Sequence, residues 1–127
     1  MRTLSLATAA LAAVLLLPAA SRAAPPPAVT LQARTAGDLA ELCSANPAEA
    51  LGAVRAAFCH GFAQGAIDDA FRRSVDKKPF CFPTPTPSRN ATLGEFVGWV
   101  RAMPDRRSQP ALEGLFQFLA ERFPCKP

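Results

Sequence analysis

Apolar side chains recur along this chain at steps of three and four residues, and the clearest run surrounds residues 58 to 71. One helix face carries the apolar residues Leu51, Val54, Phe58 and Phe62. A helix-start signal precedes them, because Asn46 can cap a helix, Pro47 is tolerated at its first position and Glu49 favours its positive end. The pattern predicts a central helix from Pro47 to about Arg73.

Two glycines, Gly61 and Gly65, lie four residues apart within this predicted helix. Glycine inside a helix costs about 0.5–1 kcal/mol relative to alanine, so the pair needs a compensating reason. We interpret it as a helix-packing notch, where the backbone of another helix or of a second subunit comes close. On this hypothesis Gly65→Leu damages packing more than Ala66→Leu.

Capping signals predict two shorter helices. Thr35 and Asp38 form a possible capping box that opens a first helix ending around Cys43. Thr92 and Glu95 form another capping box, which opens a third helix. The apolar face of that helix comprises Leu93, Phe96, Val97 and Val100.

A fourth helix is predicted to begin at Ser108 or Gln109 and to end before Pro124. Its apolar face comprises Leu112, Leu115, Phe116, Leu119 and Phe123. Residues 74–90 form one long loop, because its prolines lack a backbone donor and restrict the residues before them. Strand-like alternation is absent from the sequence. The predicted fold class is therefore all-α, a small four-helix domain.

The first 23 residues have the features of a cleavable signal peptide. A positive Arg2 precedes an apolar run from Leu4 to Leu17, and the small-x-small sequence at residues 21–23 places cleavage after Ala23. The run is shorter than the roughly 20 residues that span a bilayer, which disfavours the alternative of an uncleaved anchor. Residues 24–34 contain three consecutive prolines and are predicted to form a flexible N-terminal arm, followed by one domain at 35–127.

The charge and side-chain chemistry exclude several function classes. Removal of Arg2 and Arg22 leaves 12 basic against 10 acidic residues, a net charge of +2, which gives no reason to expect nucleic-acid or membrane binding. Asp68 and Asp69 are adjacent, about 100° apart on a helix, and so do not form a catalytic pair. The sequence contains no GxSxG motif, no HExxH motif and no phosphate-binding loop. We expect no enzyme activity, no cofactor and no metal.

Four cysteines, Cys43, Cys59, Cys81 and Cys125, lie in the predicted exported part. An even count in a small exported chain indicates two disulfides. Sequence alone allows three connectivities. We favour Cys43–Cys59, which ties the first helix to the second, and this choice leaves Cys81–Cys125. A zinc site is the competing reading, but CxxC pairs are absent and His60 is the only histidine.

Several short motifs occur in a characteristic order along the chain. They are the stretch from Cys59 to Asp68, Phe80–Pro83, Thr92–Glu95, Pro104–Arg107, Pro110–Ala111 and Phe123–Lys126. With the four cysteines and the signal peptide, this order resembles the Rap/Tai family of exported bacterial immunity proteins, which bind and inhibit peptidoglycan amidase effectors of type VI secretion. The resemblance covers nearly all of residues 35–126. It implies a periplasmic, non-catalytic protein, often a homodimer, whose partner is such an amidase.

The most promising binding segment is residues 72–90, since interaction surfaces often lie on loops. The candidate effector-binding residues are Arg72, Arg73, Lys77, Lys78, Phe80 and Phe82. Lys77 and Lys78 would steer the approach of the partner, and the two phenylalanines would anchor it unless they cover the core beneath the loop. Two alternatives remain open at this stage: a small periplasmic acid-stress chaperone of the HdeA type, and a helical carrier of apolar ligands, which would need a cavity.

Overall fold

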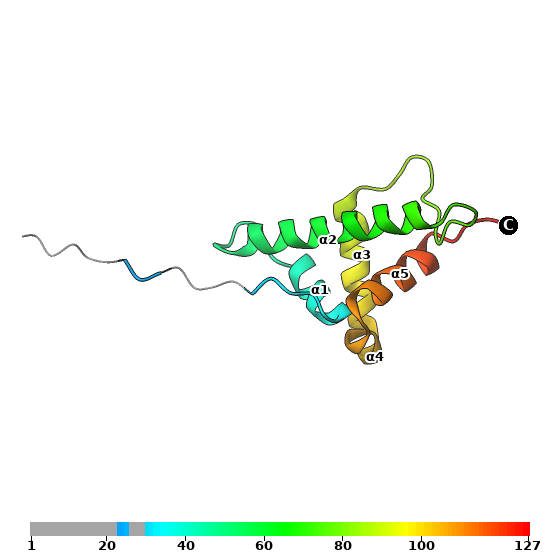
Figure 1. The fold of residues 1–127 in the computed structure, drawn as a ribbon. Helices are drawn as coiled ribbons and strands as arrows, with labels where there is room; N and C mark the ends of the chain where they lie inside the picture. Colours follow the sequence, from blue (N-terminus) through cyan, green and yellow to red (C-terminus); the bar gives the residue numbers. More distant parts are fainter. Residues whose placement is uncertain (1–22, 26–29) are drawn as a thin grey trace, which may run out of the picture.

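The computed structural model describes residues 23–25 and 30–127, so the predicted signal peptide falls almost entirely outside the described residues. Over these ranges the chain forms five helices: α1 (Ala36–Cys43), α2 (Gly52–Arg73), α3 (Arg89–Ala102), α4 (Pro104–Ser108) and α5 (Ala111–Arg122). The all-α prediction is confirmed, with the short α4 added to the four expected helices. The long α2 lies across one side of the molecule, and the other helices gather beneath it (Figure 1).

Helix α1 is the hub of the fold, since it contacts each of the other four helices. Its small residues Ala36 and Ala40, together with Leu39, are fully buried. At the start of α5, Gly114 faces Ala36 so closely that a Cβ atom there would lie 2.7 Å from the Cβ of Ala36. Only glycine therefore permits α5 to approach α1 in this way.

The capping box predicted for α1 is present. The Thr35 hydroxyl accepts a hydrogen bond from the Asp38 backbone N–H at 3.1 Å, and the Asp38 carboxylate accepts one from the Thr35 N–H at 2.9 Å. The hydrogen bond from the Thr35 backbone holds the pKa of Asp38 below its ordinary value. The sequence signal is local, so it survives unchanged in the folded protein.

The predicted start of the central helix at Pro47 is wrong, because α2 begins at Gly52. The Asn46 side chain instead accepts a hydrogen bond from the Ala48 N–H at 3.0 Å, and the Asn46 carbonyl accepts one from the Glu49 N–H at 3.0 Å. These bonds close a turn, which is the competing use of an asparagine beside a proline. The turn passes so close to α2 that a Cβ at Gly52 would lie 1.6 Å from the Asn46 carbonyl oxygen.

The predicted starts of the last two long helices are also displaced. Ser88, not Thr92, caps α3, and its hydroxyl accepts a hydrogen bond from the Ala91 N–H at 3.2 Å. Thr92 lies inside the helix, where its hydroxyl donates to the Ser88 carbonyl at 3.1 Å. Ser108 is the last residue of α4 rather than the start of the final helix, which begins at Ala111.

Polar and charged side chains join the outer surfaces of α3, α4 and α5. Glu95 pairs with Arg122 of α5, and this ion pair lowers the pKa of Glu95. The Trp99 indole N–H donates to Glu121 at 2.7 Å and lowers the pKa of that carboxyl. The Arg106 guanidinium covers the Trp99 ring at 4.1 Å from its centroid. These contacts are exposed or half-buried, and they orient helices that are already packed by their apolar faces.

Both expected disulfides are present in the structure. Cys43–Cys59 joins the end of α1 to α2, and Cys59 is 1% exposed. Cys81–Cys125 joins the long loop to the C-terminal segment, and Cys125 is exposed. The favoured pairing is therefore the one the fold adopts.

The last residues of the predicted N-terminal arm do not behave as a free arm. Leu31 and Ala33 pack against the core, and the Arg34 carbonyl accepts a hydrogen bond from the Ala111 N–H at 3.0 Å. Residues 26–29 of that arm lie outside the described residues. Among the helices in the described part of the chain, none is long and apolar enough to cross a membrane.

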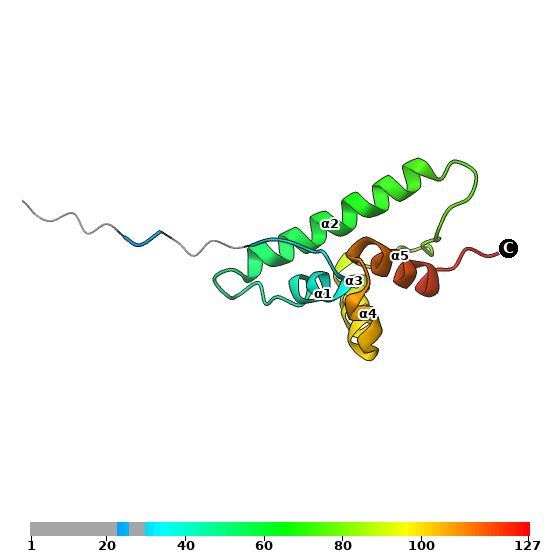
Figure 2. The ribbon, with the colours of Figure 1, turned by 60° about the horizontal axis from the view of Figure 1, so that its bottom comes forward.

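The helix-packing notch within the chain is not present. A Cβ atom added at Gly61 or at Gly65 would meet nothing within 4 Å, and both glycines are exposed on α2. The turned view shows α2 running along one side of the other helices (Figure 2), and the two glycines line an open hollow together with Arg34, Pro110 and Leu112. The second form of the hypothesis, contact with a second subunit, stays a prediction.

Candidate functional site

The last turn of α2 and the loop between α2 and α3 carry the predicted basic residues, and the structure exposes all four of their side chains to solvent. Arg72 and Arg73 close the last turn of α2, where Arg73 pairs with Asp69 at 2.8 Å. Lys77 and Lys78 are exposed, as the steering role requires. These four residues lie in the last turn of α2 and in the loop that follows it, so their charges are concentrated at one end of that helix.

Phe80 is not an exposed anchor, and that prediction is wrong. Its side chain is 0% exposed, and its ring centroid lies 5.0 Å from that of Phe71 and 6.1 Å from that of Phe116. Burial of the ring in the core lowers the free energy of the folded protein relative to a state in which the ring remains in water. The alternative that the loop covers the core with its aromatic side chains therefore holds for Phe80.

Phe82 has a different position, because it is only half-buried. Its ring lies 5.0 Å from Phe123, at the end of α5, and 5.6 Å from Phe80. Part of the Phe82 side chain therefore remains accessible to solvent, and it also lines the cleft described below. Of the two predicted anchors, only Phe82 can contact a partner without unfolding the loop.

Covalent and hydrogen bonds hold the middle of this loop to the end of α5. The Cys81 N–H donates to the Phe123 carbonyl at 2.8 Å, next to the Cys81–Cys125 disulfide. On one side of this attachment Val75 is 88% exposed. The loop is therefore fixed at Cys81, while Lys77 and Lys78 before it remain exposed to solvent.

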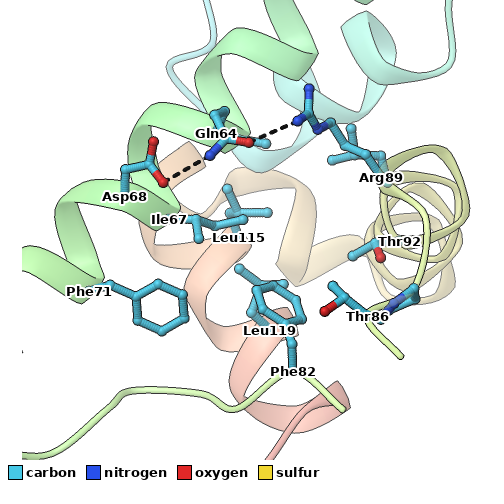
Figure 3. A pocket seen from close by; sticks show the side chains of 13 residues that line it. Gln64, Ile67, Asp68, Phe71, Phe82, Thr86, Arg89, Thr92, Leu115 and Leu119 are labelled. Atoms are coloured by element: carbon cyan, nitrogen blue, oxygen red, sulfur yellow. Dashed lines mark hydrogen bonds between the residues drawn. The ribbon is translucent and has the colours of Figure 1, made fainter. Parts of the chain in front are cut away.

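A cleft of about 370 Å³ lies between the second half of α2, the loop, α3 and α5. Figure 3 shows its walls, with Ile67 and Phe71 of α2 opposite Leu115 and Leu119 of α5, and Phe82 of the loop below. The remaining lining residues are Ala63, Gln64, Asp68, Thr86, Pro87, Arg89, Thr92 and Leu93. Its size falls within the range of ordinary ligand pockets, about 300–1,000 Å³.

Three polar side chains cross the mouth of the cleft and join α2 to α3 (Figure 3). Arg89 donates from Nη2 to the Gln64 Oε1 at 3.0 Å, and Gln64 donates from Nε2 to the Asp68 Oδ1 at 2.8 Å. We call Gln64, Asp68 and Arg89 the mouth triad. It places a carboxylate and a guanidinium on either side of a neutral amide, above apolar walls.

Neither the cleft nor the mouth triad was identified from the sequence. Gln64 and Asp68 are four residues apart, a spacing that favours a hydrogen bond along a helix, and this signal was available. Arg89 is 25 residues from Gln64, and only the return of the chain through the proline-rich loop brings them together. The cleft depends on tertiary packing, which leaves no local pattern.

The arrangement of ionisable groups offers no catalytic set among the described residues. Asp68 belongs to the mouth triad, while Asp69 pairs with Arg73. The two carboxylates therefore serve different partners, as their adjacent helical positions require. No cluster of three or more potential metal ligands occurs in residues 23–25 and 30–127. What the site can provide is a binding surface.

Comparison with known proteins gives one match. The family model described as Rap1a immunity proteins matches residues 35–125, the whole helical domain. No curated protein sequence and no solved structure matches the chain.

Proposed function

Because the chain belongs to the Rap1a immunity proteins, a family of non-enzymatic inhibitors, we propose that it binds and inhibits a peptidoglycan amidase effector of type VI secretion. The observation that carries the proposal is the family match over residues 35–125. The two disulfides support a location in an oxidising compartment, which is the periplasm for a protein of this class. Inhibition by a binding protein requires a surface and no chemistry of its own.

The proposed contact surface is the exposed part of the loop together with the last turn of α2. Lys77 and Lys78 raise the association rate with an acidic partner by long-range attraction, an effect that salt weakens. Val75 and the solvent-accessible part of Phe82 provide apolar contacts to the partner. The attachment of Cys81 to α5 reduces the conformational entropy that the loop would lose on binding.

A homodimer is a second part of the proposal. The open face of α2 at Gly61 and Gly65 is bordered by Phe62 and by Leu112 of α5, which is 44% exposed. An uncovered face with exposed apolar side chains suits contact with a second copy. Sedimentation equilibrium of the oxidised protein tests this point separately from effector binding.

Calorimetric titration against the amidase encoded beside this gene tests the main proposal. We expect a saturable one-to-one complex per subunit and loss of amidase activity on purified peptidoglycan. Lys78→Glu should lower the association rate constant and so raise the dissociation constant that the titration measures. Arg55→Glu, the same charge reversal on an exposed residue in the first half of α2, should leave that constant nearly unchanged. Absence of binding by the wild-type protein would refute the immunity function.

A further inference from the structure

We propose that the cleft beneath α2 is a receptor for a polypeptide segment of the partner, with one apolar side chain inside the cleft and the adjoining backbone amide bound to the mouth triad. This inference deepens the proposed function and rests on it for the identity of the partner. The chemistry of the occupant follows from the cleft itself.

The walls of the cleft select an apolar group. Ile67, Phe71, Phe82, Leu115 and Leu119 surround it (Figure 3). The volume of about 370 Å³ exceeds that of a single side chain, so it accommodates a residue together with part of its backbone. Burial of a Leu- or Phe-sized side chain in such a site is the typical source of binding energy at an interface.

The mouth triad selects a neutral polar group. Arg89 and Asp68 carry opposite charges on either side of Gln64. A carboxylate that approached Arg89 would also meet the Asp68 carboxylate, and an ammonium group that approached Asp68 would meet Arg89. A fatty acid or an amine with an alkyl tail is therefore a poor match for this mouth.

The backbone of an extended peptide matches the hydrogen-bonding positions that the mouth triad leaves unused. Gln64 uses one of its two amide hydrogens on Asp68 and one acceptor position on Arg89, so it keeps one donor and one acceptor position. An extended residue presents its own N–H and C=O on the same side, one donor and one acceptor from two successive trans amides without net charge, so it can pair with Gln64 in both directions. Since Gln64, Asp68 and Arg89 are exposed, the pairing needs no rearrangement of the core.

The position of the cleft also favours a protein partner. Phe82, Thr86 and Pro87 of the loop form part of its rim, so the cleft is continuous with the surface proposed for the amidase. A partner that approaches the basic part of the loop can therefore insert one side chain beside Phe82 without leaving that surface.

The sequence provides a specific reporter, because Ile67 is the only isoleucine in the chain and lines the cleft. Protein labelled at the isoleucine δ1 methyl group gives a single resonance that senses occupancy. The probe is N-acetyl-leucine N-methylamide, an apolar side chain with two backbone amides, and the comparison compound is octanoate. At millimolar concentration we expect the mimic to shift the resonance saturably, and Gln64→Ala to weaken this binding severalfold.

A matched control for Gln64→Ala is Gln117→Ala. Gln117 is also exposed and makes the same kind of hydrogen bond, to Glu121 four residues along α5 at 2.9 Å. It should leave the titration unchanged. An unshifted Ile67 resonance with the mimic, or tighter binding of octanoate than of the mimic, would overturn the proposed chemistry of the cleft.

The amidase complex provides the second arm of the test. Ile67→Trp fills the cleft and should weaken the amidase complex about tenfold or more, whereas Val54→Trp, on the exposed part of the same helix, should not. Gln64→Ala, which leaves the core intact, should weaken it in the same direction. Unchanged affinity in both cleft variants would overturn the proposal while leaving the immunity function intact. No binding by the wild-type protein would refute the immunity function. The titration with the peptide mimic would then be the only test of whether the cleft binds a polypeptide segment.

Discussion

Around Phe80 the side chains of a loop, a long helix and the last helix meet in one aromatic cluster. Phe71, Phe82 and Phe116 all have ring centroids within 6.1 Å of the Phe80 ring. A proline-rich loop has no hydrogen-bonded ladder to hold it, so the buried ring supplies much of its attachment to the domain. Within the loop, Phe80 therefore holds the loop to the domain and is not a contact residue for a partner.

Phe80→Ala should lower the free energy of unfolding by about 3–5 kcal/mol, because it removes a fully buried ring and leaves a cavity. Urea unfolding of the oxidised protein, followed by circular dichroism, measures the change. Val75→Ala in the same loop is the control, since Val75 is 88% exposed and should change the stability by less than about 0.5 kcal/mol. Similar stabilities for Phe80→Ala and the wild type would contradict the burial of this side chain.

At the scale of the helices, the existence of each long element followed from the sequence better than its limits did. The apolar face of the predicted third helix, from Leu93 to Val100, is the buried face of α3. The starts were misjudged because Asn46 and Ser108 have side chains that serve a turn or the end of a helix as well as a helix start. Which use prevails depends on where the chain must reverse, and that is a tertiary property.

The glycines show the same limit. The pair with the helical spacing, Gly61 and Gly65, faces open space, whereas the close approach of two helices occurs at Gly114, opposite Ala36. Spacing within one helix cannot reveal a contact whose other half lies almost 80 residues away in the sequence. The fold class, the disulfide pairing and the location of the basic loop could be predicted, but the cleft and its mouth triad could not.

Exchange of two glycines for alanine tests this assignment. Gly65→Ala should stabilise the protein by about 0.5–1 kcal/mol, because it raises helix propensity where space is free. Gly114→Ala should destabilise it by about 1–3 kcal/mol, because its Cβ would lie 2.7 Å from that of Ala36. Thermal unfolding of both variants gives the comparison. Destabilisation by Gly65→Ala at concentrations where the protein is dimeric would indicate that a second subunit packs on this face.

At the scale of the whole molecule, two disulfides secure opposite ends of the fold. Cys43–Cys59 ties α1 to the first half of α2, over a separation of 16 residues. Cys81–Cys125 ties the loop to the segment after α5, over a separation of 44 residues. The second half of α2 has no such link, and it is this half that forms one wall of the cleft. Of the elements around the cleft, the loop is therefore held by a disulfide, whereas the second half of α2 is held by packing alone.

Removal of each disulfide should have distinct local consequences. Cys43→Ala with Cys59→Ala should cost about 3 kcal/mol, and Cys81→Ala with Cys125→Ala about 4 kcal/mol, from the loop-closure entropy regained by the unfolded chain. Limited proteolysis at the basic residues of the loop should become faster mainly in the second variant. Equal loop cleavage in the two variants would show that the aromatic cluster alone holds the loop.

The two disulfide loops do not overlap along the chain, since the first is complete at Cys59 and the second begins at Cys81. A chain that enters an oxidising compartment from its N-terminus exposes the first pair before Cys81 and Cys125 arrive. Cys125 follows Cys81 by 44 residues, so the second bond must wait until that later stretch of the chain has also entered. An oxidase that joins cysteines in order of arrival therefore produces the native pairing directly, without disulfide reshuffling.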